Sequence, residues 1–270
     1  MSNPHLPLAN KMSLSSNDKH QESIRSMFSR IASRYDLLNR LISFHFDTFW
    51  RKKAVEALAL RRRGPVVLDL GSGTGDLSLT AAREIKDGTI IGLDFSLRML
   101  QLAQEKKRRL PYGCRTAFIL GSALAPPFKD GVFDAVMTAF VLRNIPDLNL
   151  FFRHAYRLLR PGGRLVSLDM FPPSRFPFSF IYSFYFYRLV PWIGAALAHD
   201  RSAYQYLSDS VKTFDSPETI AELIRRTGFE GVKVEKFMSG AVNRPEHPCR
   251  HFQQVFCCFF TRSPWGGCSL

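Results

Sequence analysis

Short apolar runs alternate with stretches of helical periodicity through the middle of the chain. Runs rich in β-branched and apolar residues predict strands at 65–70, 89–94, 115–120, 133–139 and 164–170. Apolar residues at helical spacing between these runs predict helices at about 75–86, 96–109 and 148–159. Strands and helices in regular alternation are typical of an α/β fold with a doubly wound, mostly parallel sheet.

The last third of the chain adds further elements. Ser216 is a favourable cap and Pro217 a favourable first residue, so a helix is predicted from there to about Thr227. Two more apolar runs predict strands at about 231–237 and 253–261. The last strand and its partner would complete a seven-stranded sheet with an antiparallel edge.

The segment before the first strand has a helical pattern. Apolar residues recur at helical spacing from Gln21 to Leu60, which predicts two or three helices, broken near Tyr35-Asp36 and again near Ser43. Open α/β sheets bind ligands at their strand ends, so we expect residues 21–60 to form a helical lid there. We expect a disordered tail at 1–20, a single domain at 21–262 and a loose C-terminus at 263–270.

Residues 171–192 are unusually aromatic, because ten of these 22 positions are Phe, Tyr or Trp. A helix that is aromatic on most sides must be buried or must contact something apolar. The segment 171–212 is therefore an inserted, largely helical piece on the ligand side of the sheet. It is either a core helix under the lid, a wall for a flat hydrophobic substrate, or a bilayer contact.

Composition narrows the class of protein. The chain has 270 residues, of which 46% are apolar, and no apolar stretch is long enough to span a membrane. No secretory signal is visible, and five cysteines without C-x-x-C pairs predict a cytoplasmic protein with reduced thiols and no metal site. The net charge is +14, and the first 63 residues carry half of it. Such a basic face suits nucleic acid, an anionic bilayer or plain solvation.

A glycine-rich turn follows the first predicted strand. Gly71, Gly73 and Gly75 are spaced two apart, and Asp76 stands where a dinucleotide fingerprint requires its third glycine. A carboxylate there is acceptable when no pyrophosphate has to be bound. The spacing therefore favours the cationic nucleoside S-adenosylmethionine (SAM) over NAD, and a turn without any ligand is the simpler alternative.

A second acid supports the nucleoside interpretation. Asp94 ends the second predicted strand, 19 residues after Gly75, where an α/β nucleotide site binds ribose hydroxyls. An aspartate in that place is also a common helix cap. Asp76 has the same two interpretations, because it either faces the amino-acid part of the ligand or caps the next helix.

Four further stretches carry a resemblance to a known family. They are Tyr35-Asp36-Leu37-Leu38-Asn39 with Ser43 and Trp50, then Leu142–Asp147, Arg157–Arg164, and Tyr204-x-Tyr206-Leu207-x-x-Ser210. Together with the glycine turn they resemble the UbiE/MenG family, the C-methyltransferases of ubiquinone and menaquinone biosynthesis. The resemblance implies a Rossmann-like class I SAM-dependent methyltransferase fold over about 24–242.

The resemblance also implies site residues. The SAM contacts fall on Thr74, Asp94, Ser122 and Ala123, beside the close backbone approach at Gly71 and Gly73. Arg143 and Asn144 follow the fourth strand and become catalytic candidates, because a guanidinium can stabilise a phenolate and orient a water that takes the proton. The alternative for Arg143 is a structural salt bridge to Asp147 or to the helix below. Weaker candidates for binding the substrate's oxygens are Tyr35, Asp36, Asn39, Tyr204 and Tyr206.

The implied reaction is methylation of a ring carbon of a prenylated quinol, with demethylmenaquinol as the first choice. A benzoquinol, another lipophilic small molecule, or a SAM-binding subunit without catalysis are the alternatives. The expected partners are the quinol, an anionic membrane surface at the inner face of the membrane and, as one option, a second copy of the chain. Methylation of RNA is disfavoured because no RNA-binding module is visible and the aromatics are not interleaved with cations.

The chain departs from the family pattern at four places. Asp47 replaces a histidine three residues before Trp50, and Asp169-Met170-Phe171 replaces an E-x-S ending. Ala139 stands near a position that often carries a hydroxyl, and the family's usual ending is absent after Gly240.

Overall fold

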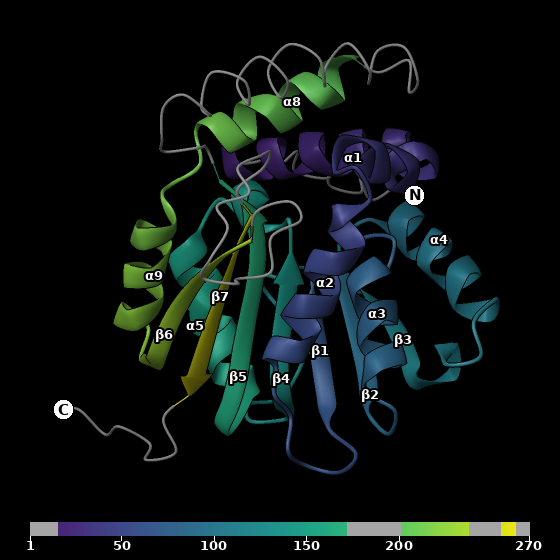
Figure 1. Cartoon of the computed structure of the whole chain (residues 1–270). Helices are drawn as coiled ribbons and strands as arrows, with labels where there is room; N and C mark the ends of the chain where they lie inside the picture. The colour runs from purple at the N-terminus through teal and green to yellow at the C-terminus, as the bar shows by residue number, and fades with distance from the viewer. Residues whose placement is uncertain (1–15, 172–200, 238–254, 263–270) are drawn as a thin grey trace, which may run out of the picture.

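A seven-stranded sheet forms the centre of the molecule (Figure 1). The computed structural model describes residues 16–171, 201–237 and 255–262. The strand order is β3-β2-β1-β4-β5-β7-β6. The strands are β1 (Val66–Leu70), β2 (Thr89–Asp94), β3 (Thr116–Leu120), β4 (Phe133–Ala139), β5 (Leu159–Met170), β6 (Phe229–Phe237) and β7 (Val255–Arg262).

The sheet confirms the doubly wound class that the alternating pattern predicted. Strands β3, β2, β1, β4 and β5 pair in parallel. The chain adds β2 and β3 on one side of β1 and then β4 and β5 on the other side. β7 pairs antiparallel with both β5 and β6, so β6 and β7 form the expected antiparallel edge. The carboxyl ends of the five parallel strands therefore share one edge of the sheet, where ligands bind in this fold class.

Helices cover both faces of the sheet (Figure 1). They are α2 (Phe46–Ala57), α3 (Asp76–Glu84), α4 (Leu97–Arg108), α5 (Leu148–Leu158) and α9 (Pro217–Arg226), with short 3-10 turns η1 (Gly113–Arg115) and η2 (Leu142–Asn144). One core joins α2 and α3 to the sheet around Trp50, and a second joins α5 and α9 around Phe151 and Phe152. Along β1, Val67 belongs to the first core and Leu68 to the second, as strand alternation requires.

The N-terminal helix α1 (Ser16–Ile42) is one continuous element that crosses above the carboxyl ends of the strands (Figure 1). The predicted break near Tyr35-Asp36 is wrong, because a stripe of buried residues that includes Ile31, Leu38 and Ile42 runs through it. The break near Ser43 is confirmed, since Phe44 and His45 have left-handed backbone angles before α2 begins. The predicted tail is wrong for residues 16–20, which belong to α1.

Other predictions fall partly outside the described residues. These are the rest of the tail at 1–15, nearly all of the aromatic segment 171–192, the chain between β6 and β7, and the C-terminus at 263–270. Of the insertion 171–212, the structure describes Phe171, whose ring stacks on Phe214, and the helix α8 (Arg201–Lys212). No helix within the described ranges is long and apolar enough to cross a membrane.

Candidate functional site

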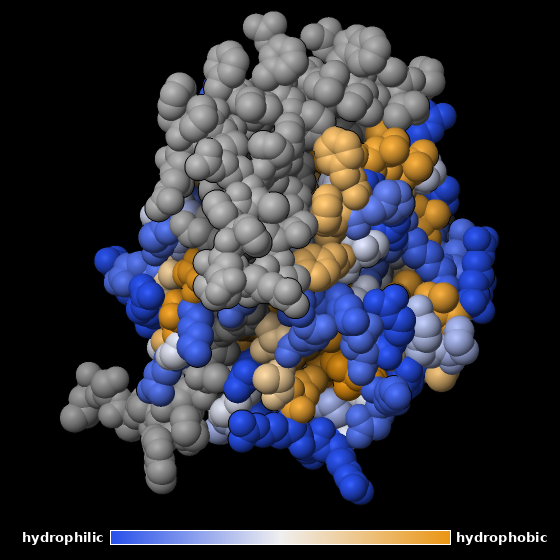
Figure 2. Space-filling view, viewed as in Figure 1, coloured by the Kyte–Doolittle hydropathy of each residue, from blue (hydrophilic) through white to orange (hydrophobic). Residues whose placement is uncertain are grey.

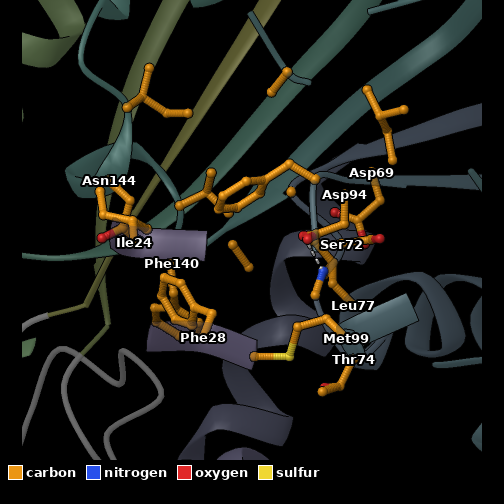
Figure 3. A pocket seen from close by; sticks show the side chains of 18 of the residues that line it. Ile24, Phe28, Asp69, Ser72, Thr74, Leu77, Asp94, Met99, Phe140 and Asn144 are labelled. Atoms are coloured by element: carbon orange, nitrogen blue, oxygen red, sulfur yellow. Dashed lines mark hydrogen bonds between the residues drawn. The ribbon is translucent and has the colours of Figure 1, made fainter. Parts of the chain in front are cut away.

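A cleft opens at the carboxyl ends of β1, β2 and β4, beneath α1 (Figure 3). Its lining comes from α1, the glycine turn, the end of β2 and the loops after β3 and β4. In Figure 3, Asp69, Ser72 and Asp94 gather at one end, whereas Ile24, Phe28, Phe140 and Asn144 lie toward the other. The cleft therefore has an acidic end and a mainly apolar end.

The glycine turn has the conformation that its sequence predicts. Gly71, Gly73 and Gly75 all have positive φ. A Cβ on Gly71 would lie 2.6 Å from the Val141 side chain, so only glycine fits there. A Cβ on Gly73 would meet nothing within 4 Å, which leaves its backbone open to a ligand in the cleft.

The turn uses its own amides internally. Gly71 N and Ser72 N both donate to Leu93 O, at 2.8 and 3.0 Å, and Gly73 N donates to Asp94 Oδ2 at 2.7 Å. A phosphate-binding loop instead points such amides at the ligand. Because these three amides are already hydrogen-bonded within the protein and several carboxylates lie beside them, the site is unsuited to a pyrophosphate and suited to a cationic ligand.

Asp94 lies where the sequence placed it, at the end of β2 and in the cleft. Besides the bond from Gly73 N, its Oδ1 accepts from Ser96 N at 2.9 Å. Burial raises the pKa of Asp94, and the backbone amides that it accepts from partly offset that rise. Each carboxylate oxygen keeps a lone pair for a further donor.

Asp69 is a site residue that the sequence reasoning missed. It is only 1% exposed, one residue before the carboxyl end of β1, and it lines the cleft. Ser78 Oγ donates to its Oδ2 at 2.6 Å, whereas its Oδ1 has no hydrogen-bond partner in the described structure. Burial raises the pKa of Asp69 to about 7. The sequence signal that could have identified Asp69 is an acid inside an otherwise apolar strand.

Asp76 belongs to an ion cluster that ties α1 to α3 and α4. Lys106 Nζ lies 2.6 Å from Asp76 Oδ1 and 2.5 Å from Asp36 Oδ2. Thr74 Oγ1 donates to Asp36 Oδ1 at 2.6 Å, so this predicted SAM contact also binds the N-terminal helix. Burial acts to raise the pKa of Asp76, but Arg51 and Lys106 outweigh it and hold that pKa below its usual range.

Asp47, one of the residues that depart from the family pattern, is the third anion of this cluster, after Asp76 and Asp36. Its carboxylate is buried and accepts from Arg40 Nη1 at 2.9 Å, from Arg51 and from Ser43 Oγ at 3.0 Å. Burial opposes the charge on Arg51, yet Asp76 and Asp47 raise its pKa above the ordinary value. Asp47 therefore holds α1 and α2 together at the edge of the cleft.

Phe140 forms part of the apolar end. It has a left-handed φ of 62°, an unusual value for a bulky residue, and its ring carries the Arg51 guanidinium 5.3 Å above its centre. Ala139, which precedes it, also lines the cleft. Such strain in a bulky residue is typical of functional sites.

Arg143 does not itself line the cleft. Its side chain is 4% exposed, and its Nη1 lies 2.7 Å from Asp169 Oδ1, whereas Asp147 instead caps α5. Arg143 Nε has no hydrogen-bond partner within the described ranges. The predicted alternative, a structural salt bridge of Arg143, is therefore present, but its partner is Asp169 and not Asp147. Asp169 is the acid of the Asp169-Met170-Phe171 stretch that departs from the family pattern.

Asn144 does line the cleft, and Tyr206 Oη donates to its Oδ1 at 3.0 Å. Tyr206 is one of the weaker candidates for binding the substrate's oxygens. Its pKa is raised by burial and lowered in part by Arg143. The structure therefore brings a buried cation, an amide and a phenol together at the end of β4.

Of the weaker candidates, Tyr35 lines the cleft. Burial raises the pKa of Tyr35, while Arg143 and a hydrogen bond with Asn39 act to lower it. Asn39 thus supports Tyr35 without lining the cleft itself. Tyr204 lies in α8, and its side chain falls outside the described residues.

Ser122 and Ala123 line the cleft beside the end of β2, as the resemblance implied. Ser122 Oγ accepts from Leu124 N at 3.1 Å, which fixes the loop after β3. In the part of the chain that the structure covers, no group of three or more His, Cys, Asp or Glu side chains is arranged to hold a metal ion.

The doubly wound sheet, the glycine turn and the acidic cleft define a SAM-dependent methyltransferase. The chain belongs to the ubiE/COQ5 methyltransferase family, which it matches over residues 15–247.

Two relatives and one solved structure illustrate the similarity. Demethylmenaquinone methyltransferase of Thermus thermophilus is 43% identical over 203 residues, which are 75% of this chain and 91% of the relative. The ubiquinone/menaquinone biosynthesis C-methyltransferase UbiE of Geobacter sulfurreducens is 43% identical over 209 residues, 77% of this chain and 81% of the relative. A SAM-dependent methyltransferase from Thermotoga maritima, a possible histamine N-methyltransferase, has a TM-score of 0.58 at 21% identity and covers 89% of this chain and 100% of its own. At that identity, the likeness shows the fold alone.

Proposed function

We propose that this chain transfers the methyl group of SAM to a ring carbon of a prenylated quinol, with demethylmenaquinol as the substrate. The observation that carries the proposal is the two-ended cleft, with carboxylates at one end and aromatic and amide groups at the other. The Thermus relative, named for demethylmenaquinone, supports this choice of substrate.

The residues of the acidic end fit SAM. Asp69 Oδ1 and Ser72 Oγ are buried without hydrogen-bond partners in the described structure, and both belong to residues that line the cleft. SAM supplies an electrophilic methyl on a sulfonium when bound. Asp94 would accept from the ribose hydroxyls, Ser122 and Ala123 would lie along the adenine, and Gly71, Gly73 and Thr74 would form the floor.

The other end fits a flat phenolic ring. Ile24, Phe28 and Phe140 offer apolar contacts, and Tyr35 and Asn144 offer hydrogen bonds to ring oxygens. A ring carbon becomes a better nucleophile when the neighbouring phenol gives its proton to water. The new C–CH3 bond would replace the S–CH3 bond of SAM, and the methylated carbon would then lose its own proton to water as the ring regains aromaticity. We assign Asn144 as the catalytic residue that contacts the phenol oxygen. Arg143 acts from behind it as a positioning residue whose charge favours the phenolate.

The test is methyl transfer from labelled SAM to a short-chain demethylmenaquinol, with the product identified by mass spectrometry. The wild-type protein should give a C-methylated product. Arg143→Ala should abolish turnover while SAM affinity stays within about threefold, since Arg143 does not line the cleft; a threefold change is under 1 kcal/mol.

Arg143→Ala also leaves Asp169 buried without its cation, so Arg143→Lys and Tyr206→Phe are needed as milder variants. Arg143→Lys should lower kcat by roughly 100-fold and move its pH profile to higher pH, because the phenol then ionises less readily. Equal loss of kcat and SAM affinity in both folded variants would contradict the assignment. No product from any demethylated quinol would contradict the proposed function.

A benzoquinol is the second candidate substrate, because the Geobacter relative is named for both ubiquinone and menaquinone. Expression in cells that lack their quinone C-methyltransferase, with ubiquinone and menaquinone measured separately, distinguishes the two substrates. We further propose that the protein acts from the cytoplasm at the inner face of the membrane, where a prenylated quinol resides.

A further inference from the structure

The turn between α1 and α2 exposes apolar side chains that the cleft does not use. Leu37 is 57% exposed, Leu41 42%, Phe44 59% and Phe49 36%. We call these four residues the apolar edge. Figure 2 shows orange, apolar side chains gathered where α1 meets α2.

The apolar edge faces away from the core. Leu37 and Leu41 are one helical turn apart, so they share a face of α1, whereas Ile24, Ile31 and Leu38 are buried on another. Phe44 follows in a strained left-handed conformation, with a φ of 51°.

Cations flank the apolar edge. The exposed residues Arg30 and Arg34 precede it along α1. Lys52 and Lys53 follow it on α2, where both lie at the surface within ion-pair distance of Glu56, at 4.0 and 2.6 Å. Between residues 30 and 56 the sequence has six Lys and Arg against two Asp and one Glu, a net charge of +3. One of these acids, Asp47, is buried in its own ion pairs.

We propose that the apolar edge inserts into the interface of an anionic lipid bilayer, with the flanking cations among the headgroups. Exposed Leu and Phe beside Lys and Arg are the pattern of an interfacial helix. A second copy of this chain fits less well, because two edges face to face would bring like charges together. Another face of α1 carries Ile24, Phe28 and Tyr35 of the cleft, so docking would set the cleft beside the lipid.

The delivery of a prenylated quinol from that lipid rests on the proposed function, whereas the docking itself does not. Flotation with vesicles of phosphatidylcholine, with and without phosphatidylglycerol, tests the docking. The wild-type protein should float with the anionic vesicles and much less with the neutral ones. The triple variant Leu37→Gln, Leu41→Gln, Phe44→Asn should lose at least about tenfold in partitioning, because three apolar side chains no longer leave water.

Asn is chosen at position 44 because it tolerates a left-handed backbone. Leu120→Gln is the matched control, since Leu120 is 49% exposed at the end of the edge strand β3 and is not part of the apolar edge. It should float like the wild type. The pair Arg30→Gln, Arg34→Gln should weaken binding to anionic vesicles alone.

Equal flotation of the triple variant and the wild type would overturn the proposal. A dimer in light scattering that the triple variant converts to monomer would also overturn it, by identifying a second copy as the occupant. Turnover of a tail-less quinol in solution separates the two proposals. If the triple variant keeps that turnover but loses flotation, the docking holds; if the wild type floats but never methylates the quinol, only the proposed function fails.

Discussion

At the scale of single residues, Asp69 is the unusual group of the cleft. A carboxylate with one free oxygen, 1% exposed, is costly unless something pairs with it. Its pKa of about 7 means that it is partly protonated at neutral pH in the free protein. A bound cation would favour its ionised form, so ligand binding and proton release are linked at this residue.

The raised pKa of Asp69 gives stability a definite pH dependence. The pKa of an aspartate in the unfolded chain is about 3.9. Between that pH and about pH 7, the folded protein therefore holds a proton on Asp69 that the unfolded chain has lost. Stability therefore falls as pH rises through this window and levels off above it. Asp69→Asn stays neutral throughout, so it should lose less stability than the wild type between about pH 5 and about pH 8, by on the order of a few kcal/mol.

Urea unfolding at a series of pH values measures this difference. Asp94 and Asp169 also have raised pKa values from burial, but they are present in both proteins and cancel in the comparison. Parallel pH profiles for wild type and Asp69→Asn would show that Asp69 does not titrate in this range.

At the scale of elements, Arg40 of α1 pairs with Asp47 of α2 and with Asp76 of α3, and Asp47 also pairs with Arg51 within α2. Asp47 is 2% exposed and Arg51 6%, so removing one partner leaves the other charged and out of water. Asp47→Ala should lower the free energy of unfolding by about 3–5 kcal/mol, measured by urea denaturation.

Glu222→Ala is the matched control for Asp47→Ala. Glu222 also pairs with two arginines, Arg225 and Arg226, but on the exposed side of α9. Solvent screens those pairs, so its unfolding midpoint should match that of the wild type. A small effect of Asp47→Ala, equal to that of Glu222→Ala, would mean that water reaches the Arg51 guanidinium.

Most elements of the described fold could be predicted from sequence because their signals are local. β2 and β4 have the predicted bounds, since each is a short, mainly apolar run that follows a Lys-Asp-Gly turn. The continuity of α1 past Tyr35 was missed, because it depends on packing against distant parts of the core. The pairing of Thr74 with Asp36 was missed for the same reason, since no local pattern encodes a contact across 38 positions.

At the scale of the whole molecule, α1 is both the roof of the cleft and part of the main core. Ile31, Leu38 and Ile42 of this helix pack in the same cluster as Val67 of β1 and Leu77 of α3. The sequence predicted that this segment covers the strand ends. It did not predict that the roof is held by charges from α3 and α4 as well as by apolar burial.

Because α1 is held both by apolar burial and by ion pairs, its susceptibility to proteolysis can report whether a ligand occupies the cleft. Trypsin requires a locally unfolded backbone, and α1 offers it Arg25, Arg30 and Arg34. A ligand that fills the cleft binds only the chain with α1 in place, so SAM at about 100 times its Kd should slow cleavage in α1 by up to roughly 100-fold. Mass spectrometry of the first fragments would follow this, with sites in α9 cut at the same rate throughout. The roof helix thus reports, by its own digestion, whether the methyl donor is bound.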